Sequence, residues 1–361
     1  MPEPRIVSLI ASATEIVAAL GFGPNLVGRS HECDFPSDVL ALPACSEPKI
    51  DIHGTSREID DRVKSLAGTA VSIYRVFPDV LRQLKPTHII TQTQCEVCAV
   101  SLKDVEQAMA GMIDIDHPPK IVALNPMALA DVWTDIRAVA ESLGASERGE
   151  RLIASLQHEL DAIRTLASGA CRPAGSSPLG ASSVEDTGGQ AASATQRQAG
   201  QRAGSSTTVQ SRPSIACLEW IDPLMSCGNW VPELVELAGG RNLLGEAGKH
   251  SPWLEWDGLA ACDADVIAIM PCGFDIPRTR AELPPLTEHP RWQTLRAVRD
   301  GRVYLTDGNQ FFNRPGPRLV ESARILAEIL HPDLFGNSLE GTGWVHLDRQ
   351  SISTPTIAAH L

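Results

Sequence analysis

The chain is poor in aromatic residues and in positive charge. Phe, Trp and Tyr make up only 4% of its 361 residues, and 31 Lys and Arg stand against 44 Asp and Glu, for a formal net charge of −13. Nucleic-acid backbones are bound by clustered Lys and Arg, so this balance argues against a nucleic-acid partner. The acidity is compatible with a positively charged partner or simply with a solubilising surface.

Long apolar runs and enzyme signatures are also absent from the sequence. No stretch reaches the roughly 18 apolar residues that a membrane span needs. No Gly-x-Ser-x-Gly, P-loop or His-Glu-x-x-His motif occurs. The first 20 residues have no basic segment before their apolar part, and Glu15 interrupts that part. We therefore expect no secretory signal and a cytoplasmic location, unless another route exports the chain to the periplasm or beyond.

What the sequence does contain is an alternation of strand and helix patterns. The β-branched runs "RIVSLI" (5–10) and "THIITQ" (87–92) are followed by segments with helical spacing, "SATEIVAALG" (12–21) and "SLKDVEQAMAGM" (101–112). The same alternation resumes at "SIACLEW" (214–220). Strands that alternate with helices predict βαβ units and parallel sheets with both faces covered.

The pattern predicts an α/β protein with two Rossmann-like lobes. We place the N-terminal lobe at 1–140 and the C-terminal lobe at 213–335, joined by a long helix over 141–167 with one apolar stripe. Between 168 and 212, Gly, Ser, Ala, Gln and Thr dominate, which predicts a disordered low-complexity insertion. Residues 336–361 are expected to form a C-terminal tail.

Ligands of parallel α/β sheets bind beyond the carboxyl ends of the strands. The loops at these ends collect many of the scarce aromatic residues, which indicates a pocket between the lobes for a large, partly flat, apolar ligand. One aromatic side chain buries about 150–250 Å², so two or three could anchor such a molecule. The candidate ligand-binding residues are Ser12, His31, Cys95, Trp220, Trp230, Trp253, Phe274, Phe311, Phe312 and Arg314.

The nine cysteines are an odd number, which argues against a disulfide framework in a chain that stays inside the cell. His31 and Cys33 form a His-x-Cys pair, and Cys95 and Cys98 form a Cys-x-x-Cys pair before a helix. These four could hold zinc or an iron–sulfur cluster. Alternatively, a cysteine at the helix start could be a redox thiol, one ligand could contact the cobalt of a corrinoid, or all could be small packing residues.

Five segments resemble the vitamin B12-binding, BtuF-like substrate-binding proteins of ABC transporters. They are "RIVSLIASATEIVAALGFGPNLVGRSHECDFP", "DVLRQLKPTHIITQ", "PELVELAGGRNL", "SPWLEWDGLAACDADVIAIMP" and "RVYLTDGNQFFNRPGPRLVESARILAEIL". The resemblance implies two lobes bridged by one long helix with little hinge motion. It also implies a cobalamin-like ligand held between the lobes, and acidic residues that dock onto arginines of a membrane permease; Asp79 and Glu236 match those positions.

The cysteine-bearing motifs "SHECDFP", "CSEPK" and "QCEVCAVSLKDVE" are absent from the well-known periplasmic members of that family, and they resemble a subgroup without a signal peptide. A corrinoid-binding protein rather than an enzyme is therefore the leading hypothesis. The alternative is a metal-containing, iron–sulfur or redox enzyme centred on His31, Cys33, Cys95 and Cys98.

Overall fold

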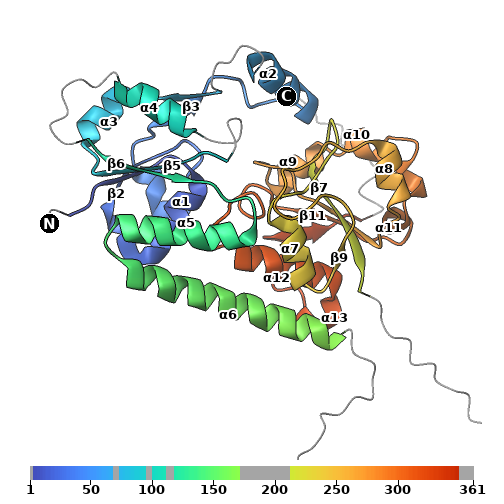
Figure 1. Cartoon of the computed structure of the whole chain (residues 1–361). Helices are drawn as coiled ribbons and strands as arrows, with labels where there is room; N and C mark the ends of the chain where they lie inside the picture. Colours follow the sequence, from blue (N-terminus) through green and yellow to red (C-terminus); the bar gives the residue numbers. More distant parts are fainter. Residues whose placement is uncertain (1–2, 68–72, 95–99, 111–117, 171–211, 349–361) are drawn as a thin grey trace, which may run out of the picture.

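The computed structural model describes residues 3–67, 73–94, 100–110, 118–170 and 212–348. These residues form two lobes, and each lobe is built on a sheet with parallel strands and helices packed on its faces (Figure 1). The predicted α/β class and the two-lobe architecture are therefore confirmed. The predicted insertion falls almost entirely on 171–211, which lies outside the described residues.

The sheet of the first lobe has the strand order β2-β1-β5-β6, and all neighbouring strands are parallel. Its central strands are buried and rich in Ile and Val, as expected for a sheet that is covered on both faces. The strands are β1 (Ile6–Ser8), β2 (Leu26–Arg29), β5 (His88–Gln92) and β6 (Lys120–Leu124). The helices of this layer are α1 (Ala11–Val17), α3 (Pro78–Leu84), α4 (Leu102–Ala110) and α5 (Leu129–Ser142), with short turns η1 (Ala18–Phe22), η2 (Gly23–Asn25) and η3 (Ser37–Ala41).

The sheet of the second lobe has the order β12-β11-β10-β7-β8, with β9 also paired to β7. Strands β7, β9, β10 and β11 run parallel to one another, whereas β8 is antiparallel to β7 and β12 is antiparallel to β11. The strands are β7 (Ser214–Trp220), β8 (Met225–Ser226), β9 (Arg241–Asn242), β10 (Val266–Ile269), β11 (Val303–Thr306) and β12 (Trp344–His346). The helices are α7 (Val231–Leu237), α8 (Trp256–Ala261), α9 (Ile276–Ala281), α10 (Pro284–Thr287), η4 (Trp292–Thr294), α11 (Arg296–Arg299), α12 (Leu319–Leu330) and α13 (Pro332–Phe335).

Strand β12 corrects the predicted C-terminal boundary. Residues 336–348 were expected to belong to a tail, but β12 pairs with β11 and extends the sheet. The Trp344 indole is buried, and its Nε1 donates a hydrogen bond to Glu328 Oε2 at 2.9 Å. Glu328 in α12 also accepts hydrogen bonds from Ser338 Oγ and from the backbone N–H of Leu339. The second lobe therefore continues to at least residue 348.

Helix α6 (Ser146–Ala170) runs along the base of both lobes (Figure 1). It starts at Ser146, inside the predicted bridging segment, because α5 ends at Ser142 and Gly144 turns the chain between the two helices with φ +67°. It packs against α5 in the first lobe and against α7 and α12 in the second. Within the described part of the chain, no helix combines the length and the apolar character needed to cross a membrane.

One apolar core runs through the base of both lobes. Ile16 from α1, Leu156 from α6 and Leu326 from α12 are buried members of the same cluster. Because this packing is continuous, separating the lobes at the base would expose apolar surface, at about 25 cal/mol per Å². The base is therefore the rigid part of the molecule.

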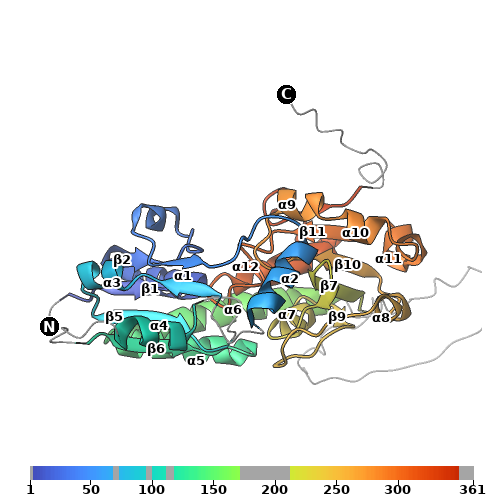
Figure 2. The same ribbon diagram turned by 90° about the horizontal axis from the view of Figure 1, so that it is seen from above.

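The segment between β2 and α3 forms an excursion that the sequence analysis did not predict. Strands β3 (Ser46–Pro48) and β4 (Tyr74–Val76) pair antiparallel, and α2 (Ser56–Ala67) lies between them in the chain. Seen from above, α2 stands at the boundary between the lobes (Figure 2). The sequence was read here as a polar stretch, so α2 is a difference from expectation.

Candidate functional site

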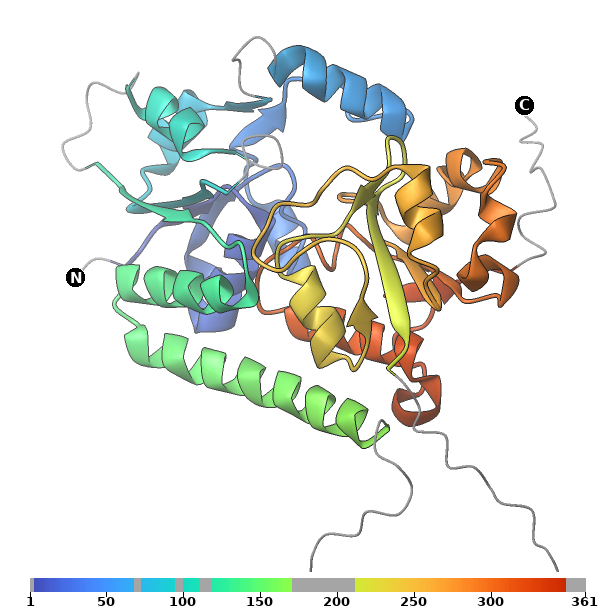
Figure 3. The same cartoon turned by 45° about the vertical axis from the view of Figure 1, so that its right-hand side comes forward.

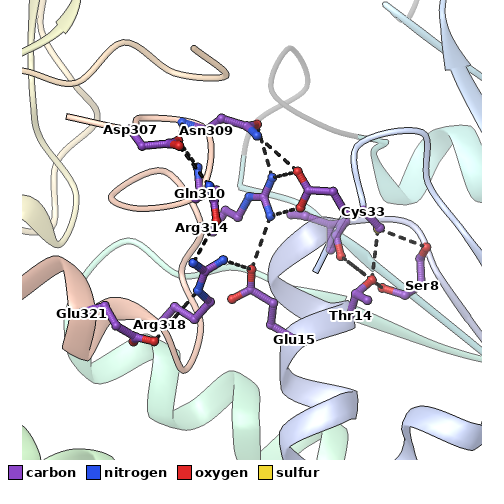
Figure 4. A network of polar contacts seen from close by, with 12 residues as sticks. Ser8, Thr14, Glu15, Cys33, Asp307, Asn309, Gln310, Arg314, Arg318 and Glu321 are labelled. Atoms are coloured by element: carbon purple, nitrogen blue, oxygen red, sulfur yellow. Dashed lines mark hydrogen bonds and ion pairs between the residues drawn. The ribbon is translucent and has the colours of Figure 1, made fainter. Parts of the chain in front are cut away.

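Loops at the carboxyl ends of the parallel strands meet where the two lobes face each other. In the first lobe these loops follow β1 and β2, and in the second lobe they follow β7, β10 and β11. An ion-pair network joins them (Figure 4). Arg314, in the loop after β11, binds both carboxylate oxygens of Asp34, at 2.5 and 3.0 Å, and reaches Glu15 Oε1 at 3.4 Å. Asn309 contributes further hydrogen bonds to both Arg314 and Asp34.

The two carboxyl groups of this network are perturbed in opposite directions. Burial raises the pKa of Glu15 to about 7, although Arg314 and Arg318 act to lower it. Burial would also raise the pKa of Asp34, but the hydrogen bonds and charge of Arg314 outweigh it, so this pKa is lowered. The network therefore holds one fully ionised carboxylate and one carboxyl that titrates near neutral pH.

Arg318 adds a second cation to the boundary between the lobes. Its Nη1 lies 3.7 Å from Glu15 Oε1, and its Nη2 donates to Gln310 Oε1 at 3.1 Å. The guanidinium lies 4.2 Å from the ring centre of Phe35 and 4.5 Å from that of Phe311. Since Phe35 belongs to the first lobe and Phe311 to the second, Arg318 is a cation–π contact between them.

Beside this network, Glu32 and Tyr74 from the first lobe lie within electrostatic range of Cys272 from the second lobe. Tyr74 hydrogen-bonds the Glu32 carboxyl, and Cys272 lies within the electrostatic range of Glu219, Glu32 and Arg314. Burial raises the pKa of Glu32 to about 7, yet its side chain remains 37% exposed. Glu32 therefore lies at the boundary between the lobes with part of its side chain open to water. We call Glu32, Tyr74, Glu219, Cys272 and Arg314 the interlobe site.

The interlobe site is suited to binding rather than to nucleophilic chemistry. Burial raises the pKa of Glu219, and Ser251 Oγ donates to its carboxylate at 2.6 Å. Burial and the nearby Glu219 raise the pKa of the Cys272 thiol to about 12, so it stays protonated at neutral pH. A thiol needs to ionise to act as a nucleophile or a soft ligand. The site therefore offers carboxyl and phenol groups that accept and donate hydrogen bonds.

The structure brings His31 and Cys33 to this boundary but gives them different partners. His31 Nδ1 lies 3.0 Å from Ser46 Oγ, and burial lowers the pKa of its imidazole to about 4, assisted by Arg29. Cys33 is fully buried, with its Sγ 3.0 Å from Thr14 Oγ1 (Figure 4), and burial raises the pKa of this thiol.

Over the described ranges, no group of three or more His, Cys, Asp or Glu side chains is placed to hold a metal ion. Cys95 and Cys98 lie outside the described residues. The four-residue zinc or iron–sulfur site therefore stays a prediction.

Three of the predicted aromatic ligand contacts lie in the protein interior. Trp230 and Phe312 are buried in the core, where Trp230 Nε1 donates to the Phe312 carbonyl oxygen at 2.7 Å. The indole N–H and both rings are used in packing here, and the expected contact of Trp230 and Phe312 with a ligand stays a prediction. Phe311 is also buried, and its ring is covered by Arg318.

The remaining predicted contacts lie closer to the boundary. Trp220 is half-buried and pairs with the buried Phe274 at a ring-centre distance of 5.1 Å. Trp253 is 53% exposed. Ser12 is buried, and Gly316 of the second lobe packs closely against it. A Cβ built on Gly316 would lie 3.4 Å from the carbonyl oxygen of Ser12. Arg314 is buried and paired with Asp34 as described above, rather than free to meet a ligand.

The predicted docking residues lie on the surface, one on each lobe. The side chain of Asp79, at the start of α3, is 83% exposed and pairs with Arg82 at 2.5 Å. The side chain of Glu236, in α7, is 49% exposed and pairs with Arg212 at 2.6 Å. Both carboxylates are therefore accessible to a partner.

Comparison with known proteins places this architecture. No family model matches the chain. The uncharacterized ABC transporter substrate-binding lipoprotein YvrC of Bacillus subtilis (strain 168) is 20% identical over 338 residues, covering 92% of this chain and 82% of that protein. The apo periplasmic heme-binding protein RhuT from Roseiflexus sp. RS-1 superposes with a TM-score of 0.60 at 22% identity, covering 92% and 99% of the two chains. The chain has the class III substrate-binding-protein fold.

Other proteins with the class III fold differ in the ligand that their names state. A periplasmic heme-binding protein from Pseudomonas aeruginosa gives a TM-score of 0.62 at 19% identity, covering 92% of this chain and 94% of its own. The periplasmic vitamin B12-binding protein BtuF of Vibrio cholerae gives 0.55 at 18% identity, covering 91% and 97%. All are named as binding proteins, which favours binding over the redox-enzyme alternative. The expected cytoplasmic location finds no support, because the curated relative is a lipoprotein.

The sequence analysis missed most of the interlobe site. Glu32 and Asp34 lie inside "SHECDFP", and Glu219 lies near the end of the predicted strand 214–220. Both positions are at strand ends, where the sequence predicts ligand-binding loops. Sulfur and aromatic side chains of these loops were expected to form the ligand site, and the carboxylates between them were not among the candidates. Tyr74 carried no such signal, because it lies on β4, a strand that was not predicted.

Proposed function

We propose that this protein is the substrate-binding component of an ABC transporter and holds a corrinoid between its lobes. The observation that carries the proposal is that loops from both lobes bring polar groups together at the lobe boundary, where Arg314 of the second lobe binds Asp34 of the first and the neighbouring Glu32 is partly open to water. Proteins with this fold are named for heme, vitamin B12 and iron ligands. The fold alone is therefore compatible with several classes of ligand, and the choice between them depends on the side chains of the site.

The charges of the site favour a corrinoid over heme. Heme carries two propionate carboxylates, whereas the rim of a corrinoid carries neutral carboxamides around a cationic cobalt centre. The site presents Glu32 and Glu219, while Arg314 is already paired with Asp34. Because burial raises the pKa of both carboxyl groups, carboxamides can exchange hydrogen bonds with them in either protonation state, whereas a propionate beside them is repelled whenever they are ionised.

Titration tests the proposal directly. The purified chain is titrated with cobinamide, cyanocobalamin and hemin, and binding is followed by calorimetry and visible absorbance. We expect a corrinoid to bind more tightly than hemin. Glu32→Gln combined with Glu219→Gln should narrow that preference, because it removes the repulsion toward propionates. Glu150→Gln, an exposed carboxylate on α6, is the control. Tight hemin binding without corrinoid binding would contradict the proposal.

We also propose that Asp79 and Glu236 contact the permease. Both are exposed, and they lie on different lobes, so a partner could grip the protein at two points. Replacing both by alanine should leave the ligand affinity unchanged and lower ligand delivery by the reconstituted transporter. Asp161→Ala, which breaks a matching exposed i,i+3 pair with Arg164 on α6, is the control and should have no effect.

A further inference from the structure

Residues 49–67, which contain α2, form an arm that is attached to the first lobe. Strands β3 and β4 hold its base, where the Lys49 N–H donates to the Ile73 carbonyl oxygen at 2.7 Å. Its apolar side chains Ile50, Val63 and Leu66 pack against the first lobe's own hydrophobic cluster. Both kinds of contact bind the arm to the first lobe.

The arm is also stable as a unit by its local contacts. Thr55 and Glu58 form a reciprocal capping box at the start of α2, with the Thr55 N–H donating to Glu58 Oε2 at 2.8 Å and the Glu58 N–H donating to Thr55 Oγ1 at 3.2 Å. Arg62 Nη1 donates to the Asp51 carbonyl oxygen at 3.0 Å, which ties the loop to the helix. The helix therefore needs no partner from the second lobe to remain folded.

The contacts between the arm and the second lobe are of a different kind. Arg57 forms a two-pronged ion pair with Asp222, and the side chains remain 48% and 30% exposed. The backbone of Ser56 donates to Glu282 Oε2 at 2.9 Å. Further contacts are the hydrogen bonds Trp220 Nε1 to Ser56 O and Arg278 Nη2 to Ile52 O, and the cation–π pair Lys64 over Trp253. Partly exposed polar contacts of this type are individually weak.

The arm and α6 lie on opposite sides of the lobe boundary (Figures 1 and 3). On the α6 side the lobes are joined by the continuous apolar core, which resists separation. On the other side they are joined by the polar contacts of the arm. The arm reaches Trp220, which pairs with Phe274 on the second lobe. It therefore covers the one predicted aromatic pair that remains at the boundary.

We infer that the arm is the gate of the interlobe site. It stays on the first lobe, releases Asp222, Glu282 and Trp220 of the second, and so opens a path for the ligand without separation of the lobes. The inference rests on the proposed function, because a gate needs a ligand to admit. The arm has apolar contacts with the first lobe and polar contacts with the second. The polar contacts are the weaker ones, so the arm separates from the second lobe.

Stopped-flow kinetics of cobinamide binding to the full chain tests the gate. Arg57→Ala and Glu282→Ala each remove one arm contact, and each should raise the association and dissociation rate constants about two- to fivefold, with a smaller change in the dissociation constant. The double variant should raise both rates about tenfold. The reciprocal exchange Arg57→Asp with Asp222→Arg should restore slow kinetics. Arg137→Ala, which breaks an exposed pair with Glu150 far from the arm, is the control and should match wild type.

Hydrogen exchange of the ligand-free protein supplies a readout that does not depend on the ligand. Amides of residues 52–60 should exchange faster in Glu282→Ala than in wild type, while those of β1 and β5 should not change. If cobinamide binds and the arm variants leave both rate constants at wild-type values, the gate is refuted and the proposed function stands. If neither cobinamide nor hemin binds the wild type, the proposed function fails and the gate fails with it. Unchanged exchange in the arm would also refute the gate.

Discussion

Replacing Arg314 with alanine should destabilise the protein strongly, because it leaves two carboxyl groups without their shared cation. Asp34 loses two charged hydrogen bonds and Glu15 loses one. A hydrogen bond to a charged group contributes about 1.5–3 kcal/mol, and breaking a buried pair costs about 3–5 kcal/mol. Because the Asp34 side chain is more than a third exposed, its share is discounted. We expect a loss of about 2–4 kcal/mol at pH 8.

The same variant should show a defined dependence on pH. The folded-state pKa of Glu15, about 7, lies above its ordinary value of 4.5, so this carboxyl costs stability as the pH rises from 4.5 through 7. Without Arg314 that pKa rises further, and the cost continues to grow above pH 7. The contribution of Asp34, whose pKa is lowered from 3.8, is present at both pH 5 and pH 8. The loss should therefore be about 1 kcal/mol larger at pH 8 than at pH 5.

Urea denaturation followed by far-ultraviolet circular dichroism measures both quantities. Arg137→Ala, which breaks an exposed ion pair, is the control and should leave the free energy of unfolding close to that of wild type. A loss for Arg314→Ala that is no larger than the control would refute the reasoning. A larger loss at pH 5 than at pH 8 would refute the assignment of the titrating group to Glu15.

Three further predictions concern the core and the boundary. Trp230→Phe keeps an aromatic ring but removes the indole N–H, so the Phe312 carbonyl loses its donor and the smaller phenyl ring leaves part of the core unfilled. It should cost about 1–3 kcal/mol in urea denaturation without changing the corrinoid dissociation constant; weakened binding would show that Trp230 contacts the ligand. Leu156→Ala should cost about 2–5 kcal/mol in the same assay, because it leaves a cavity in the apolar core shared by the two lobes. A cost below about 1 kcal/mol would contradict a continuous core between the lobes. The His31 imidazole should remain neutral at pH 5.5 by NMR, since its pKa is lowered to about 4. Its contribution to stability is therefore lost as the pH falls from 6.5 towards 4. Titration near pH 6.5 would show that the imidazole is not buried as described.

The periodic parts of the fold could be predicted from the sequence, since alternating strands and helices leave a local signal. The arm could not be predicted with the same rule. Helix α2 has few apolar residues, Ile59, Val63 and Leu66, within a charged segment, so its tertiary contacts and capping box rather than its hydrophobic pattern define it. Strand β12 was missed for a similar reason, because a three-residue strand carries little pattern of its own.

The site was predictable as a set of loops but not as a set of contacts. Arg314 was expected to meet a ligand, and it instead pairs with Asp34, 280 residues away in the chain. Such a pairing depends on how the lobes are set against each other, which local sequence does not encode. Trp230 was expected at the boundary because Gly and Asn precede it. The structure uses those residues for backbone geometry, since Asn229 has φ +53° and Gly228 lies against the backbone of Lys249.

The continuous packing along α6 has a consequence for signalling to a membrane partner. Many two-domain receptors close about a hinge when a ligand binds, so their partner recognises a change in overall shape. Here the continuous apolar core at the base opposes that movement, so we expect Asp79 and Glu236 to keep nearly the same spacing with and without a cargo molecule. A transporter that distinguishes loaded from empty protein would then have to sense a local element at the rim rather than a change in overall shape.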